Sequence, residues 1–206
     1  MTEEISLLKQ DTVEMLRQAQ AMFRASFDGL MKHDINILDQ VLKGEGKITK
    51  DYDNLTSSAI ETVKKKLPEK DKKVIMCMVD ILVATERIGD FCVGLAERTE
   101  YKIRENLLFS EEAVEEYKGL FNRVDKVLTG IIEAMKADDK KLAKDALKDR
   151  SVIYALIEES RANHIDRSAK GICDEWAKIR YLDMLDFVKE IVDRCAEISG
   201  RCPDMI

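Results

Sequence analysis

Proline is scarce in this chain of 206 residues: only Pro68 and Pro203 occur, together with nine glycines. Hairpin turns and strand ends depend on these two residue types, so their scarcity argues against a β-rich fold. The sequence also lacks an apolar run of the roughly 18 residues that a membrane span needs. Its start, MTEEISLLKQD, lacks the cationic and apolar regions of a signal peptide. We therefore predict an all-helical protein that stays in the cytoplasm.

An excess of basic residues is absent as well. Forty acidic residues against thirty-four basic ones give a formal net charge of -6. Because contacts to phosphates of nucleic acids need a basic surface, this balance argues against a general nucleic-acid-binding protein. The sequence contains no HExxH pattern, Ser-His-Asp set or glycine-rich phosphate loop. An enzyme of these classes is therefore not expected.

The cysteines do not form a metal-binding pattern. They are odd in number and show no CxxC spacing: Cys77, Cys92, Cys173, Cys195 and Cys202. The first four lie in or beside apolar helical runs, where a thiol acts as a small hydrophobic side chain. We predict buried thiols in preference to metal ligands.

The stretch from Asp80 to Glu97, DILVATERIGDFCVGLAE, is the centre of the pattern. Its apolar residues recur at three- and four-residue steps and form one stripe of a helix. Gly89 lies in that stripe, which indicates close packing, because glycine costs about 1 kcal/mol against alanine inside a helix. Glu86 and Asp90 are four residues apart and project from one side, where they repel unless a cation, a basic partner or water separates them.

The apolar spacing along the whole chain predicts six long helices joined by short turns. They cover about 3–33, 34–66, 68–106, 110–137, 138–171 and 174–200. In the third, ten of the eleven residues from Val74 to Ala84 are apolar. We predict that this segment lies in a buried central helix, with a docking interface as the alternative.

The two halves of the chain repeat one plan. The second predicted helix aligns with the fifth at an offset of 104 residues, and the third with the sixth at an offset of 103. A near-constant offset indicates duplication. We predict an all-α fold of two tandem three-helix bundles with antiparallel helices, 1–109 and 110–206, related by a pseudo-twofold axis. The architecture is like that of spectrin repeats.

Two motifs resemble the PhoU family of phosphate-uptake regulators. TERIGDFCVGLAE, residues 85–97, resembles the signature LERIGDHAxNIAE. In the second half, NHIDRSAKGICDEWAKIRYLDML, residues 163–185, resembles HIxRLxxGxCxPExGxxxLDLL. The resemblance implies the two-bundle fold and a regulator without enzymatic activity. Its partners would be a phosphate transporter, including the sodium/phosphate type, or a sensor kinase, and it would meet the membrane only through such a partner.

Some members of this family carry metal clusters on E/DxxxD motifs. The matching positions here are Glu45 and Thr49, Glu86 and Asp90, Asp149 and Ile153, and Lys189 and Asp193. Three of the eight carboxylates are missing, and clusters of hard cations need several. The resemblance therefore implies at most one divalent or ferric ion (Fe, Mn, Zn, Ni or Mg), on Glu45, Glu86 and Asp90.

That site has an alternative without metal. Glu86 and Asp90 would then be solvated or paired with basic residues. In the second half, Lys189 is expected to replace the ion by pairing with Asp193 or Asp149. We predict that His33 and His164 are surface or capping residues and that Trp176 anchors the core or an interface.

Three functions follow from these observations. The leading hypothesis is a regulatory module of phosphate uptake that binds a transporter or sensor kinase, with a homodimer through Val74 to Ala84 expected. The second is a metal-binding helical bundle that uses Glu86 and Asp90. The third is a purely structural helical module.

Overall fold

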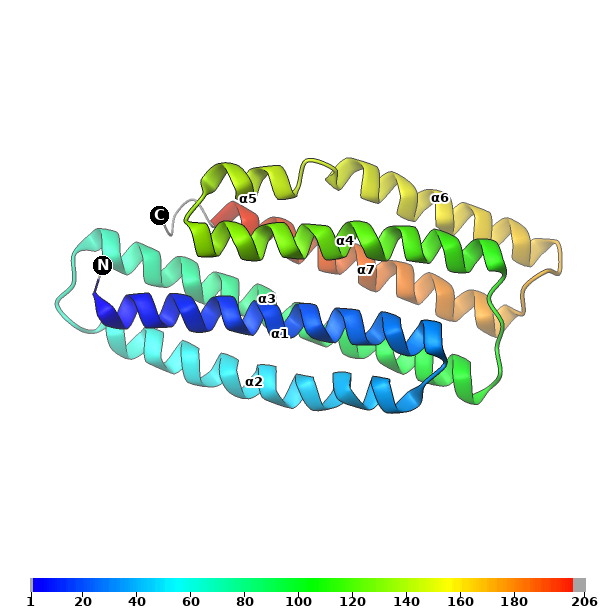
Figure 1. The fold of residues 1–206 in the computed structure, drawn as a ribbon, viewed down its shortest axis with the longest axis horizontal. Coiled ribbons are helices and arrows are strands. Elements are labelled where there is room, and N and C mark those ends of the chain that lie inside the picture. The colour runs from blue at the N-terminus through cyan, green and yellow to red at the C-terminus, as the bar shows by residue number, and fades with distance from the viewer. Residues whose placement is uncertain (1, 202–206) are drawn as a thin grey trace.

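The computed structural model describes residues 2–201, and all regular secondary structure in that range is α-helical. The helices are α1 (Glu3–Lys32), α2 (Ile35–Val63), α3 (Glu69–Arg104), α4 (Glu111–Ala137), α5 (Lys140–Ala146), α6 (Arg150–Ala169) and α7 (Glu175–Arg201). They run nearly parallel to one long axis (Figure 1).

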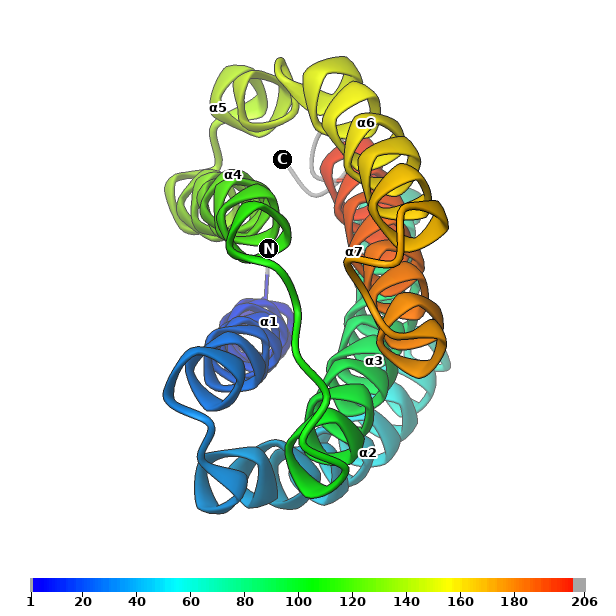
Figure 2. The same cartoon turned by 90° about the vertical axis from the view of Figure 1, so that its right-hand side faces the viewer.

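The helices form two bundles that lie side by side. Helices α1, α2 and α3 make the first, and α4 to α7 make the second (Figure 1). The end view in Figure 2 shows α3 and α7 adjacent to each other, with α1 and α4 on the opposite side. The contact between α3 and α7 is the most extensive of any helix pair. The predicted fold of two tandem helical bundles is confirmed, whereas the division into two domains at residue 109 stays a prediction.

One predicted helix is divided. The sequence pattern indicated a single helix over 138–171, but α5 ends at Ala146 and α6 begins at Arg150. At the end of α5, Ala146 lies against α4, where a Cβ on Gly130 would be 2.8 Å from the Cβ of Ala146. The break allows the chain to follow α4 closely and then to turn toward α7.

Local sequence explains the other helix ends. Asp34 precedes α2 and accepts a hydrogen bond from the backbone N–H of Asn36 at 2.9 Å, as expected of an N-cap. His33 ends α1 in the left-handed region, with φ 52°. The prediction that His33 is a capping residue is confirmed.

Helix α3 contacts α1 and α2 within the first bundle and α7 of the second. A Cβ on Gly89 would lie only 3.3 Å from Cδ1 of Ile48 on α2, which explains the glycine by close approach. Most of the segment from Val74 to Ala84 is buried, but Met76 and Val83 are 53% and 41% exposed. Four of the five cysteines lie buried as predicted, and Cys202 is outside the described residues.

Candidate functional site

The predicted acidic site lies on neighbouring helices of the first bundle. Glu86 and Asp90 project from α3, and Glu45 belongs to α2. Arg87, on the same helix as the acidic pair, lies 3.9 Å from Glu86 and 3.3 Å from Asp90. The hydroxyl of Thr49 donates a hydrogen bond to Glu45 at 3.3 Å. The acidic residues are thus partly balanced by side chains of their own helices.

Repulsion between these carboxylates remains. Burial, and next the charge of Asp90, raise the pKa of Glu86 above its usual value. Glu45 and Asp53 act in the same direction, whereas Arg87 opposes them. A bound cation would relieve this repulsion. However, nowhere between residues 2 and 201 do three or more His, Cys, Asp or Glu side chains meet as metal ligands would. The residues do not form a metal site as they stand, and an ion there stays a prediction.

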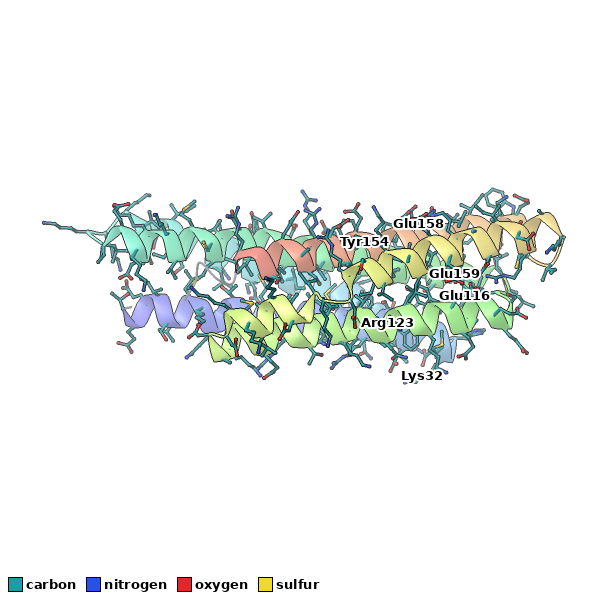
Figure 3. All side chains as sticks on the ribbon, turned by 90° about the horizontal axis from the view of Figure 1, so that it is seen from above. Lys32, Glu116, Arg123, Tyr154, Glu158 and Glu159 are labelled. Carbon is teal, nitrogen blue, oxygen red and sulfur yellow. The ribbon has the colours of Figure 1, made fainter. Side chains whose placement is uncertain are left out.

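The corresponding place in the second bundle is occupied by an internal cation. The guanidinium of Arg150 donates a hydrogen bond to Oδ1 of Asp193 at 2.8 Å. The hydroxyl of Tyr154 donates to the same oxygen and accepts a bond of 2.6 Å from Arg150. Figure 3 shows Tyr154 on α6, where that helix runs beside α7.

Electrostatics keeps Asp193 ionised. Burial alone would raise its pKa, but the hydrogen bonds from Tyr154 and Arg150, with Lys189 nearby, hold that pKa below its usual value. Lys189 was predicted to pair with Asp193 or Asp149, whereas the cation that pairs with Asp193 is Arg150, which was not predicted. Ile153 is fully buried, and its aliphatic side chain has no atom that could bind a metal. No ion is needed at this second site.

A buried polar cluster lies at the other end of the second bundle. His164 is fully buried and stacks on Tyr181, with 4.2 Å between ring centroids. Within the described part of the chain, neither ring nitrogen has a hydrogen-bond partner. Burial, and next the charge of Arg167, lower the pKa of His164 to about 4. The prediction of a surface or capping role for His164 is wrong, because its ring is part of an aromatic core.

An ion pair beside this histidine joins α4 to α6. Arg167 donates two hydrogen bonds to Glu116, at 3.0 and 2.8 Å, and both side chains are largely buried. Glu116 lies on α4 alongside α6 (Figure 3). Burial raises the pKa of Glu116, but the bonds from Arg167 and Asn163 outweigh it and keep that pKa below its usual value.

One group of large apolar side chains is exposed where α7 begins. Ile172, Trp176 and Ile179 are 60%, 57% and 41% exposed. Trp176 and Ile179 are three residues apart, so they share a face of α7. We call these three residues the Trp176 patch. Of the two roles predicted for Trp176, its exposure favours an interface.

Comparison with known proteins finds a matching domain and similar folds. Residues 12–99 match the family model of the PhoU domain. The structure of PhoU from Pseudomonas aeruginosa superposes with a TM-score of 0.90 and 15% identity, over 97% of this chain and 95% of that one. The phosphate transport system regulatory protein PhoU from Streptococcus pneumoniae gives 0.87 and 14%, over 97% and 93%.

A more distant structure has the same fold. A PhoU-like protein from Shewanella oneidensis gives a TM-score of 0.65 with 11% identity, over 98% of this chain and 97% of that one. No curated protein sequence matches the chain. None of the helices in residues 2–201 is both long and apolar enough to cross a membrane.

The fold defines an all-helical protein built of two bundles side by side. Residues 12–99 of the chain match a PhoU domain, and the fold as a whole is that of the PhoU structures. The resemblance that the ERIGD motif indicated is thereby confirmed.

Proposed function

We propose that this protein regulates phosphate uptake by binding a phosphate transporter or a sensor kinase through its helical surface. The observation that carries the proposal is the PhoU domain at residues 12–99, within a fold that matches PhoU structures over 97% of the chain. One of those structures is of a regulatory protein of a phosphate transport system. The role requires recognition and no catalysis.

The Trp176 patch is the part of the surface best suited to such a partner. Tryptophan side chains contribute strongly to the centres of protein interfaces, where their large apolar area becomes buried. Ile172 and Ile179 extend that area, and all three side chains are exposed before any partner binds. The entropic cost of ordering these side chains on binding is small, because the backbone of Trp176 and Ile179 is already fixed in helix α7.

Direct binding tests the proposal. The cytoplasmic subunits of the phosphate transporter and the sensor kinase of the source organism are purified, and binding is followed by calorimetry. We expect the wild-type protein to bind one of these two partners. The affinity should fall tenfold or more in the double variant Trp176→Ser, Ile179→Ser. The matched control is Leu42→Ser, Val152→Ser, which removes two side chains that are 41% and 43% exposed on other helices. No binding of either partner by the wild type would contradict the proposal.

The metal-binding function remains a second candidate, favoured by one observation. Burial raises the pKa of Glu86 most, and carboxylates from two helices raise it further, a repulsion that a bound cation would relieve. The metal titration described in the Discussion tests it.

A further inference from the structure

The turn between α2 and α3 is strongly basic. Residues 64–73, KKKLPEKDKK, contain six lysines and two acidic residues, a net charge of +4 in a chain of net charge -6. This turn forms one end of the elongated molecule (Figure 1). We call its six lysines the basic tip: Lys64, Lys65, Lys66, Lys70, Lys72 and Lys73.

Several lysines of the basic tip are not neutralised by neighbours. Lys65 pairs with Glu4 at 2.5 Å, and Lys72 with Glu69 at 2.8 Å. Across the described residues, no ion pair is formed by Lys64, Lys66 or Lys70. These three side chains are exposed.

Helix stability explains only part of this charge. Lysines 64 to 66 follow the C-terminal end of α2, where the helix dipole favours cations. Lys70 and Lys73 lie in the first turns of α3, where the same dipole disfavours them. Glu69 and Asp71 offset this in part, and the hydrogen bond from Lys72, followed by the charge of Lys73, lowers the pKa of Glu69. The dipole of α3 therefore does not account for the exposed lysines in its first turns.

Apolar side chains accompany these charges. A cleft of about 490 Å³ lies between the start of α3 and the end of α7, lined by Lys70, Lys73 and Met76 among others. Met76 is 53% exposed, and Ile60, in the last turns of α2, is 51% exposed. The far side of the cleft is formed by Arg201, which pairs with Asp80 at 3.0 Å. Cations and exposed apolar groups thus occur together at one end of the protein.

We propose that the basic tip binds the surface of a membrane rich in anionic phospholipid. Lysine ammonium groups attract phosphate as point charges, without the planar pairing that arginine offers to a single carboxylate. An anionic membrane surface can contact all the lysines at this end of the molecule at once, whereas an acidic peptide would contact only some of them. Met76 and Ile60 would enter the interfacial region of the lipid. This direct contact departs from the expectation that the protein meets the membrane only through a partner. It does not depend on the Trp176 patch.

Vesicle binding tests the proposal. The full chain is sedimented with vesicles of phosphatidylcholine alone and of phosphatidylcholine with one-third phosphatidylglycerol. Each lysine near an anionic surface contributes about fivefold to the affinity for vesicles. The affinity should therefore fall on the order of 100-fold in the triple variant Lys64→Gln, Lys66→Gln, Lys70→Gln. The same three positions changed to arginine should retain binding. The matched control is Lys140→Gln, Lys141→Gln, Lys144→Gln, which removes the same charge from α5, beside Asp138, Asp139 and Asp145. Circular dichroism verifies that each variant is folded.

The expected result is binding to the anionic vesicles only, weakened by 0.5 M salt and abolished in the glutamine variant of the tip. The proposal is overturned if the wild type does not bind, or if the α5 control loses as much as the tip variant. It is also overturned if glycerol phosphate at 1 mM releases the protein from the vesicles, since the tip would then be a site for a small anion. Binding of an acidic peptide by the basic tip, without binding to vesicles, would also overturn the proposal.

Discussion

Gly94 of α3 faces the ring of Phe187 of α7, and a Cβ at this glycine would lie 2.8 Å from the ring atoms Cε2 and Cζ. The two helices belong to different halves of the chain, so this contact helps to hold the bundles together. The ring is fixed further by Arg98, whose guanidinium carbon lies 5.1 Å from its centroid.

Gly94→Ala should therefore destabilise the protein. The added methyl group cannot fit without displacing Phe187, which should lower the free energy of unfolding by about 1–3 kcal/mol. The control is Gly119→Ala on α4, where no atom lies within 4 Å of the added Cβ. That change should stabilise by about 0.5–1 kcal/mol through helix propensity. Urea unfolding measures both, and equal effects would contradict the packing described for Gly94.

The buried histidine predicts a pH dependence. The pKa of His164 is about 4 in the folded protein, below its ordinary value of 6.5. Protons then bind the unfolded chain preferentially, so stability is lost as the pH falls from 6.5 toward 4. At pH 5 the loss should be about 2 kcal/mol. His164→Phe keeps a ring against Tyr181 and should remove this part of the pH dependence. Parallel stability curves for wild type and variant between pH 7 and pH 5 would contradict the assignment.

The ion pair between α4 and α6 should contribute more than those on the surface. Glu116→Ala leaves the guanidinium of Arg167, which is largely buried, without its partner and should cost about 3 kcal/mol. The control is Glu158→Ala, which removes an ion pair with Arg161 at 3.6 Å on the surface, where the Glu158 side chain is 63% exposed. That change should cost less than about 1 kcal/mol. Similar losses for both, measured by thermal unfolding, would show that the Arg167 pair does not stabilise the second bundle.

Metal binding should be confined to the first bundle. Added Mn²⁺ or Zn²⁺ would relieve the repulsion between Glu86 and Asp90 and raise the unfolding midpoint. Glu86→Gln should abolish this rise. The control is Glu61→Gln, which removes an exposed carboxylate of α2 outside the predicted site and should preserve the rise. Arg150 already pairs with Asp193 in the second bundle, so Asp193→Asn should leave metal binding unchanged. No rise in the wild type would favour the metal-free alternative, in which Arg87 and water balance the carboxylates.

The sequence predicted the helical fold well because its helices have regular apolar spacing and clear caps. Asp34 and Ser110, for example, both accept hydrogen bonds from the backbone as N-caps. The break before α6 was missed because neither proline nor glycine marks it in DALKDR. The close approach of Ala146 to Gly130 is a tertiary contact, which helical periodicity along one segment does not reveal.

The site was harder to predict for the same reason. Arg150 and Asp193 are 43 residues apart, so nothing local indicates that they meet. His164 lies among charged residues in the sequence, yet the packing of α6 on α7 buries it against Tyr181. The serine, histidine and serine at positions 160, 164 and 168 occupy one buried face of α6 at four-residue steps. That spacing was the one signal in the sequence that could have revealed the buried histidine.

The regulatory role is tested most directly by phosphate uptake in living cells. The gene is deleted in the source organism, and uptake of labelled phosphate is measured after growth with abundant phosphate. The deletion should change the rate of uptake, and the wild-type gene should restore it. The gene with Trp176→Ser and Ile179→Ser should fail to do so while producing normal amounts of protein. An unchanged rate of uptake in the deletion strain would contradict the proposed function.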